Sequence, residues 1–350
     1  MLQATVTKHS LIFKQASGTS RGVLHQKPSW FFKVFDDENP QTYGVGECSI
    51  IPGLSPDDNS DLEPFIQNVL KNINFYIEDK STLLQFPSVQ FAIDTALLDL
   101  KNKGHRILFP GEFTNGKDSI KINGLIWMGS KDFMRKQIGE KIEEGFKCIK
   151  LKIGSLNFEE EISILKEIRM QFSPEMIELR LDANGAFHPE NALAKLKRLS
   201  DFHIHSIEQP IKAGQIEEMA KLCEQTPIPI ALDEELIGIN KFEAKRKLLE
   251  DINPQYIILK PSLLGGFERS SEWIKIAEEH QIGWWVTSAL ESNIGLNAIA
   301  QWTYQLDNSM PQGLGTGKLF SNNIPSPLQI NDAKLFYNPE NHWDLNQIIR

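Results

Sequence analysis

Charged residues stand near the carboxyl ends of several short apolar runs, and their types and spacing could support one shared site. They are Lys150 and Lys152 in CIKLKIG, Asp182 in LRLDANG, Glu208 in HSIEQP, Asp233 in IALDEE and Lys260 in YIILKPS. From Lys152 onward, successive members are 30, 26, 25 and 27 residues apart. Because burying a lone charge is costly unless a partner compensates it, this regularity predicts that the charges meet in one place.

The three carboxylates are of the kind that binds a divalent metal. Asp182, Glu208 and Asp233 offer hard oxygen ligands, which suit Mg²⁺ or Mn²⁺ better than zinc. No His-rich or Cys-rich spacing competes with them. Such a cation could accept a substrate carboxylate and act as a Lewis acid. We therefore expect a Mg²⁺ site, with Mn²⁺ as the alternative, supported by Asn184 and Glu234 beside the ligands.

The lysines could form an acid/base pair. Lys150 and Lys152 are two residues apart, so on a strand both side chains point to the same face. We expect these ammonium groups, helped by partial burial and the metal, to lower each other's pKa and to give a base near neutral pH. Lys260 would approach from the opposite side. A substrate carbon between Lys152 and Lys260 could then lose an α-proton, and the enediolate would be held electrostatically.

Each position also has a plain structural explanation. Asp182 could form a turn with Asn184, and Lys260 could simply begin a loop. Single strand-end charges are mostly solvated, but five such positions in phase favour an active site at the end of a barrel. Glu47 is expected at a turn or an interdomain contact rather than at the reacting centre.

Composition excludes several classes of function. The net charge is −9, from 37 Lys and Arg against 46 Asp and Glu, and no basic stripe for nucleic acid is present. Cys48, Cys148 and Cys223 are too scattered for a disulfide framework or a metal site, and we expect buried thiols. No signal peptide and no apolar stretch of ~20 residues is evident. We expect a cytoplasmic protein without membrane contact, and a homo-oligomer stays open.

Alternating β-rich and helical patterns run from about residue 116 to 318. Seven apolar runs predict parallel strands buried on both faces, at 120–128, 148–153, 177–182, 204–208, 228–233, 256–260 and 283–289. Units of about 25–30 residues are typical of a barrel, and the glycine-rich segment 311–317 is the weak candidate for an eighth strand. An open doubly wound sheet would gather its functional residues at one switch point. We therefore predict an α/β fold, a TIM-type (β/α)7β barrel.

The first part of the chain has a different pattern. LQATVTKHSLIF, SWFFKVFD and TYGVGECSI predict antiparallel strands, and helical patterns follow at 61–77 and 88–103. Strands followed by helices indicate a separate α+β domain. We predict an N-terminal capping domain over 1–115, completed by 324–350, and a barrel over 116–323 with its active site at the carboxyl ends of the strands.

Together these residues resemble the enolase superfamily, and most closely its muconate-lactonizing subgroup. In that subgroup a Lys-x-Lys motif ends the second barrel strand, and Asp, Glu and Asp metal ligands end the next three. A lysine ends the sixth strand. The superfamily's lysine base and Mg²⁺-held ene-diolate are among the established examples of pKa tuning. This chain has every element, in Lys150 to Lys152, Asp182, Glu208, Asp233 and Lys260.

Within the subgroup, the segments 288–301 and 313–330 resemble the seventh- and eighth-strand regions of the o-succinylbenzoate synthase family. The resemblance implies a lyase of menaquinone biosynthesis that dehydrates 2-succinyl-6-hydroxy-2,4-cyclohexadiene-1-carboxylate. Lys152 would then take the α-proton and protonate the departing hydroxyl, and Lys260 would stabilise the enediolate and the ring face.

Other activities of the superfamily are alternatives to this dehydration. A dipeptide epimerase would carry an Asp-x-Asp motif at the eighth strand, where this chain has Gly313 to Gly317 without a carboxylate. An N-succinylamino-acid racemase could use the same two lysines. Muconate cycloisomerisation lacks a matching substrate loop. A barrel that has lost its chemistry and serves only as a scaffold is disfavoured because every catalytic position is kept.

Substrate selectivity is expected from loops around the barrel mouth. In the capping domain the segments 14–22 and 51–55 could close over the site and exclude water. There, Arg21 could meet the succinyl carboxylate of the substrate. Further candidate substrate-binding residues lie in the seventh- and eighth-strand regions, and they are Ser288, Ser292, Asn293, Gly315 and Thr316.

Overall fold

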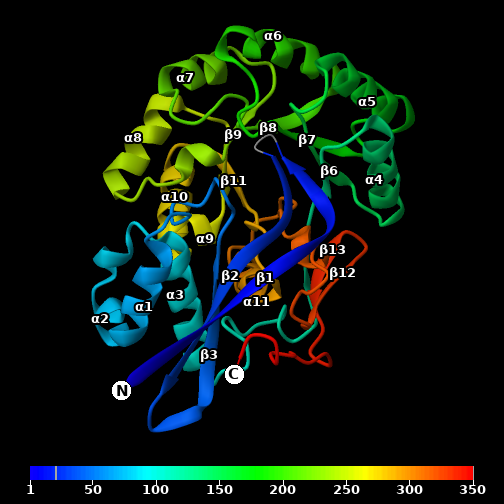
Figure 1. Cartoon of the computed structure of the whole chain (residues 1–350). Coiled ribbons are helices and arrows are strands. Elements are labelled where there is room, and N and C mark those ends of the chain that lie inside the picture. Colours follow the sequence, from blue (N-terminus) through cyan, green and yellow to red (C-terminus); the bar gives the residue numbers. More distant parts are fainter. Residues whose placement is uncertain (20–21, 350) are drawn as a thin grey trace.

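The computed structural model describes residues 1–19 and 22–349, and the side chains of 16–19 are not described. A parallel sheet surrounded by helices makes up most of the molecule, and a β-rich N-terminal cap lies against it (Figure 1). The long β1–β2 hairpin of the cap runs up to the parallel sheet (Figure 1). No helix within the described residues is long and apolar enough to span a membrane.

Seven parallel strands form the central sheet in the order β11-β10-β9-β8-β7-β6-β5. They are β5 (Gly124–Ile126), β6 (Cys148–Lys152), β7 (Glu178–Asp182), β8 (Ile204–Glu208), β9 (Ile230–Leu232), β10 (Tyr256–Leu259) and β11 (Gly283–Val286). The strand order follows the chain without interruption, as expected for consecutive βα units. All seven predicted runs therefore contribute a strand to this sheet.

Helices between the strands cover the outer face of the curled sheet (Figure 1). They are α4 (Lys131–Glu143), α5 (Phe158–Gln171), α6 (Pro189–Leu199), α7 (Ile216–Gln225), α8 (Phe242–Ile252), α9 (Pro261–Leu264), α10 (Phe267–Glu279) and α11 (Asn293–Gln305). Short 3-10 helices occur at η1 (Lys80–Leu83), η2 (Ser200–Phe202), η3 (Glu234–Leu236) and η4 (Gly315–Lys318). One large hydrophobic cluster joins the strands to these helices.

The two ends of the sheet differ from the sequence prediction. The run 120–128 is divided into β4 (Ser119–Lys121), which pairs elsewhere, and β5 of the parallel sheet. The expected eighth strand is reduced to isolated bridges, in which Gln312 pairs with Ile122 and Gly313 pairs with Thr287. Glycine-rich sequence packs few side chains and favours strand pairing weakly. The structure is thus an α/β fold with a curled parallel sheet and a short bridge between its edges.

The cap consists of three antiparallel strands and three helices. They are β1 (Leu2–Thr19), β2 (Gly22–Asp36), β3 (Asn39–Ser49), α1 (Leu62–Lys71), α2 (Ile73–Glu78) and α3 (Pro87–Lys101). Residues 14–19, predicted as part of a loop, continue β1. Strand β3 lies so close to α3 that a Cβ on Gly44 or Gly46 would overlap a helix carbonyl oxygen. Glycine at both positions therefore permits this packing.

The C-terminal segment contacts both parts of the molecule. Strands β12 (Leu328–Asn331) and β13 (Lys334–Tyr337) form a three-stranded sheet with β4. Beyond them, Ile348 packs in a buried cluster with Ile324 and with Phe31 and Val45 of the cap. These contacts join the tail to the cap and to the segment that precedes β5, while the predicted domain boundaries stay a prediction.

Candidate active site

The predicted charged residues gather at the carboxyl edge of the parallel sheet. In register, Lys152 of β6 lies beside Asp182 of β7, which lies beside Glu208 of β8. Asp233 follows β9 directly, and Lys260 follows β10. The three carboxylates therefore come from the strands between the two lysine positions. Because consecutive parallel strands end at the same edge, regular spacing in the chain becomes proximity in space.

Each carboxylate of the cluster contacts a lysine. Lys150 Nζ lies 2.7 Å from Glu208 Oε2 and 3.4 Å from Asp182 Oδ2. Lys152 Nζ donates to Asp182 Oδ2 at 2.7 Å and to Asn184 Oδ1 at 2.8 Å. Lys260 contacts Asp233 closely and lies 3.9 Å from Glu208 Oε1. In addition, the Asn184 backbone N–H donates to Asp182 Oδ1 at 3.1 Å. The turn between Asp182 and Asn184 that the sequence also allowed is therefore present beside the charged cluster.

Electrostatics in the cluster favour the charged forms of Lys150 and Lys260. Burial works against the charge on Lys150, but Glu208 and Asp182 outweigh it and hold the pKa of Lys150 above its ordinary value. Burial also opposes the charge on Lys260, and Asp233 and Glu208 raise its pKa. The prediction that neighbouring ammonium groups lower their pKa values is therefore wrong for Lys150 in this structure, because opposite charges within hydrogen-bond distance dominate.

The donor set fits a hard divalent cation. Asp182, Glu208 and Asp233 are 1%, 1% and 2% exposed. Glu208 Oε1 is buried without a hydrogen-bond partner among the described residues, and a buried acceptor of this kind costs free energy. As they stand, no three carboxylate, histidine or cysteine side chains in the described ranges converge closely enough to hold an ion. A cation would have to replace lysine contacts as the partner of these oxygens.

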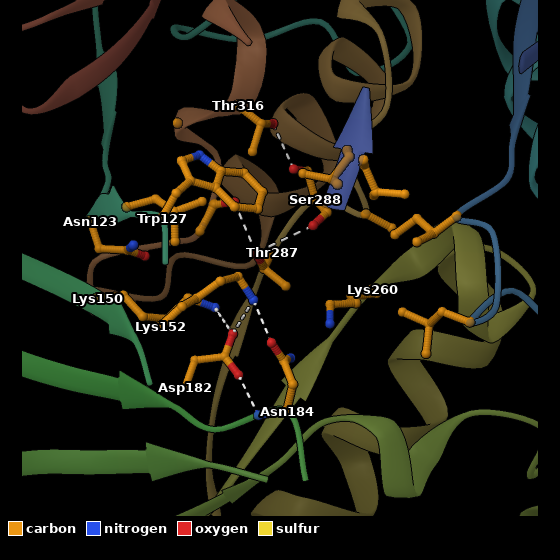
Figure 2. A pocket seen from close by; sticks show the side chains of 18 of the residues that line it. Asn123, Trp127, Lys150, Lys152, Asp182, Asn184, Lys260, Thr287, Ser288 and Thr316 are labelled. Carbon is orange, nitrogen blue, oxygen red and sulfur yellow. Dashed lines mark hydrogen bonds and ion pairs between the residues drawn. The ribbon is translucent and has the colours of Figure 1, made fainter. Parts of the chain in front are cut away.

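A cavity of about 270 Å³ opens above the cluster. Lys150, Lys152 and Lys260 line it with Asp182 and Asn184 (Figure 2), whereas Glu208 and Asp233 do not line it. Its apolar wall comes from the cap, the β5 region and the loop after β11, with Leu24, Ile51, Leu54, Leu125, Trp127 and Leu290. The cavity is thus charged at its floor and apolar at its sides, as in many small-molecule sites.

The predicted substrate-binding residues divide into two groups. Ser288, Gly315 and Thr316 line the cavity, and the Ser288 and Thr316 hydroxyls are 2.6 Å apart. Ser292 and Asn293 do not line it, against the prediction. Their side chains are used elsewhere, with Ser292 Oγ donating to a cap carboxylate and Asn293 Nδ2 donating to a backbone carbonyl.

Two predicted residues remain, Arg21 and Glu234. Arg21 lies outside the described residues. Glu234 does not line the cavity, and its Oε1 accepts a hydrogen bond from Asn184 Nδ2 at 3.1 Å. Glu234 therefore supports the asparagine that contacts Lys152. Its predicted supporting role beside the metal ligands stays a prediction.

Sequence reasoning missed several residues of the site. Asn123, Leu125 and Trp127 all line the cavity, and the Trp127 ring centre lies 5.8 Å from Lys152 Nζ. Their spacing of two residues was the available signal, because alternate residues of a strand share a face. Gln209 was also missed. Its Oε1 accepts a hydrogen bond from the Asp233 backbone N–H at 3.1 Å, which helps to position the residue that follows β9.

Comparisons with known proteins agree on a family. The family model described as "Enolase C-terminal domain-like" matches residues 134–337. The chain is 47% identical to the o-succinylbenzoate synthase of Desulfotalea psychrophila (strain LSv54 / DSM 12343), across 95% of this chain and 98% of that protein.

Solved structures agree with the sequence comparisons. The crystal structure of MenC from Desulfotalea psychrophila LSv54 has a TM-score of 0.85 and 44% identity, covering 96% of this chain and 99% of that one. The dipeptide epimerase from Enterococcus faecalis V583, complexed with Mg and the dipeptide L-Leu-L-Tyr, has a TM-score of 0.83 and 21% identity, covering 99% of both chains. The second likeness shows the fold alone.

Proposed function

This chain belongs to the enolase C-terminal domain-like family, and from that membership we propose that it is an o-succinylbenzoate synthase, a lyase of menaquinone biosynthesis. The reaction removes water from 2-succinyl-6-hydroxy-2,4-cyclohexadiene-1-carboxylate and yields o-succinylbenzoate. The observation that carries the proposal is the 47% identity to a protein of that name across 95% of the chain. The facing lysines of the cavity support it, because the reaction begins with proton abstraction next to a carboxylate.

Lys152 is proposed as both base and acid. Its Nζ, as a neutral amine, takes the proton from the ring carbon that carries the carboxylate, and the C–H electrons move toward that carboxylate. Lys152 then returns the proton to the ring hydroxyl, which leaves as water while the electrons form the new ring double bond. One group can serve both steps only if the two bonds break on the same face, so the elimination is syn.

Lys260 stays charged on the other side of the cavity. Its position beside Asp233 and Glu208 keeps an ammonium group where negative charge develops on the substrate. A divalent cation held by Asp182, Glu208 and Asp233, which we propose to be Mg²⁺, would supply further stabilisation of charge on the substrate carboxylate. Loss of water makes the ring aromatic, which favours the forward reaction.

The cavity walls fit the two ends of this substrate. The rings and alkyl groups of Trp127, Leu125 and Leu290 can pack against the cyclohexadiene ring. We propose that the succinyl carboxylate meets the hydroxyls of Ser288 and Thr316, next to Gly315 in the cavity lining. Arg21 is kept as a further candidate for the same carboxylate.

The finer architecture is proposed on the same basis. The bridges of Gln312 to Ile122 and of Gly313 to Thr287 support a (β/α)7β barrel closed by a short eighth segment. The cap packs with the C-terminal segment around Ile348, which supports a capping domain completed by residues 324–350.

The test of the function is a comparison of kcat/KM for three substrates with Mg²⁺ present. The cyclohexadiene substrate is expected to be turned over best, ahead of N-succinylamino acids and of Ala-Glu dipeptides. A kcat/KM for either alternative above that for the cyclohexadiene would overturn the assignment. Both alternatives are measured because one lysine on each side of a carbon could also move a proton between its two faces, as racemisation and epimerisation require.

A further inference from the structure

Three buried charges lie where the cap meets the loop between β11 and α11. Lys27 of β2 is 1% exposed, and Glu47 of β3 and Glu291 of the loop are both 0% exposed. None of the three lines the cavity. Buried charges are costly unless they are paired and hydrogen-bonded, so their partners show what they hold in place.

Glu47 links the cap to the start of α11 through hydrogen bonds. Its Oε1 accepts hydrogen bonds from Ser29 Oγ at 2.8 Å and from the Ser292 backbone N–H at 3.0 Å. Its Oε2 accepts from Ser292 Oγ at 2.6 Å and from the Gly295 backbone N–H at 3.0 Å. A carboxylate at a helix N-terminus is stabilised by the free N–H groups and the helix dipole. Glu47 is thus an interdomain contact, as the sequence indicated.

Glu291 joins the two loops that carry site residues. One of its oxygens accepts from Ser262 Oγ, and the other accepts from the Ala289 backbone N–H at 2.8 Å. Ser262 belongs to α9, the single helical turn that begins directly after Lys260, and Leu263 N–H donates to the Lys260 carbonyl at 2.9 Å. The position of the Lys260 backbone is therefore linked to Glu291 by two hydrogen bonds and one turn.

The other loop held by Glu291 forms part of the cavity wall. Residues 287–290 line the cavity, and Leu290 has a φ of +59°. The left-handed region is unfavourable for a leucine, so this loop needs outside contacts to keep its shape. The hydrogen bond from Ala289 N–H to Glu291 is one such contact. Another is the buried cluster of Ala289 with Leu263 and with Ile51 of the cap.

Lys27 balances part of the negative charge of Glu47 and Glu291. Its Nζ donates to Ser49 Oγ, and burial lowers its pKa while the nearby Glu47 and Glu291 oppose that lowering. Both carboxylates therefore act electrostatically on the same cap lysine. Hydrogen bonds of Glu47 join the cap to α11, and those of Glu291 join the cavity wall to the turn after Lys260.

We propose that Glu291 is a positioning residue, which sets the place of Lys260 and of the cavity wall 288–290 through its hydrogen bonds to Ser262 and to the Ala289 amide. This inference rests on the proposed function only in the choice of substrate. Glu291 touches no substrate, since it does not line the cavity, and it acts through Ser262 and the Ala289 amide. Small misplacements of a reacting group are costly in rate, which makes such a link matter for turnover.

The test measures kcat and KM for the cyclohexadiene substrate with wild type, Glu291→Gln, Ser262→Ala and the double variant. Glutamine keeps the shape of the side chain, but its amide group can no longer accept both hydrogen bonds. We expect kcat per folded protein to fall about tenfold or more in each single variant, with KM within about threefold. The double variant should lose no more than the slower single variant, because both changes break one path.

A matched control removes a buried charge elsewhere. Lys245 is 0% exposed, pairs with Glu272 at 2.7 Å and does not line the cavity. Lys245→Met should keep kcat per folded protein within about twofold of wild type, since loss of a buried charge alone does not move Lys260. If Glu291→Gln or Ser262→Ala behaved like this control, or if their effects multiplied in the double variant, the inference would be wrong.

Failure of the proposed function would be visible separately. In that case wild type would not turn over the cyclohexadiene, and the same variants would be compared by α-proton exchange in D₂O on whichever substrate wild type accepts. Slower exchange in Glu291→Gln and Ser262→Ala would still support the positioning link. Unchanged exchange would overturn it.

Discussion

The two lysines of β6 have different surroundings although they share a face. Lys150 contacts two carboxylates, Glu208 and Asp182, and the balance of its contacts raises its pKa. Lys152 contacts Asp182 and the neutral Asn184, and it faces the ring of Trp127. Lys152 thus has one carboxylate partner where Lys150 has two, and its place beside Trp127 is the one proposed for the base.

This difference predicts a large effect of Lys152→Ala. Without the amine, no group at that point can take the α-proton, and we expect kcat for the cyclohexadiene substrate to fall by about 10²–10⁴-fold. Steady-state kinetics with saturating Mg²⁺ measure it. The exposed Lys247→Ala serves as the control and should keep wild-type kcat. A Lys152→Ala enzyme within tenfold of wild type would rule out this lysine as the base.

At the scale of elements, the placement of the site depends on the fit of β3 to α3. Gly44 and Gly46 let the strand approach the helix backbone at Ala96 and Ala92. The next residues of the same strand, up to Ser49, carry Glu47 toward α11. Close packing in the cap is therefore coupled to the loop that lines the cavity.

Gly46→Ala is predicted to destabilise the protein. The added methyl group would overlap the Ala92 carbonyl oxygen, and such overpacking typically costs about 1–3 kcal/mol. Thermal or denaturant unfolding followed by circular dichroism measures the change. Gly139→Ala in α4 is the matched control, since nothing lies within 4 Å of the new methyl group. It should stabilise the helix by about 0.5–1 kcal/mol, and equal effects of both changes would contradict the packing argument.

The start of α3 carries a predicted pH dependence. Asp57 is 0% exposed and accepts from the Ser88 backbone N–H at 2.8 Å and from Ser88 Oγ at 2.9 Å. Burial raises the pKa of Asp57 from 3.8 to about 6 despite these hydrogen bonds. The folded protein then binds this proton more tightly than the unfolded chain, so the contribution to stability is full below about pH 4 and is lost as pH rises through about 6.

Asp57→Asn tests whether the stabilising contribution of Asp57 is lost as the pH rises, because asparagine does not titrate. The unfolding free energy of wild type minus that of Asp57→Asn should fall by about 2 kcal/mol between pH 4 and pH 7, from a pKa difference of about 2. Urea unfolding at a series of pH values measures it. A difference that stays constant with pH would show that Asp57 titrates as in the unfolded chain.

At the scale of the whole molecule, one cavity is assembled from both parts of the chain. Its floor comes from strand ends β6, β7 and β10, and its walls include Leu24 and Ile51 of the cap. The β1–β2 hairpin that carries Leu24 reaches the sheet from the far side of the cap (Figure 1). The cavity is thus lined by residues of both the sheet and the cap.

Metal binding should stabilise the entire fold. A ligand that binds only the folded state at about 100 times its Kd adds about 2.7 kcal/mol, which corresponds to a rise in Tm of about 4 °C for a chain of this length. We expect Mg²⁺ to raise Tm and EDTA to reverse the rise and abolish turnover. Asp233→Asn should lose the shift in Tm, whereas Glu272→Gln, at a remote ion pair, should keep it. An unchanged Tm in saturating Mg²⁺ for wild type would contradict the proposed site.

The sequence by itself determined the sheet, its order and the placement of six charged residues at one edge. Strand periodicity and near-regular spacing are local properties, and consecutive parallel strands convert them into proximity. It also indicated that Ser288 and Thr316 belong near the site, where both line the cavity.

Only the tertiary structure decided which partners each side chain contacts. Ser292 turns to Glu47, a residue 245 positions away in the chain, instead of to the cavity. Lys150 lies between two carboxylates, so its pKa rises where a neighbouring lysine alone predicted a fall. Such outcomes depend on distances of a few ångströms between segments remote in sequence, because hydrogen bonds and charge pairs weaken steeply with separation. Spacing along the chain carries no information about them.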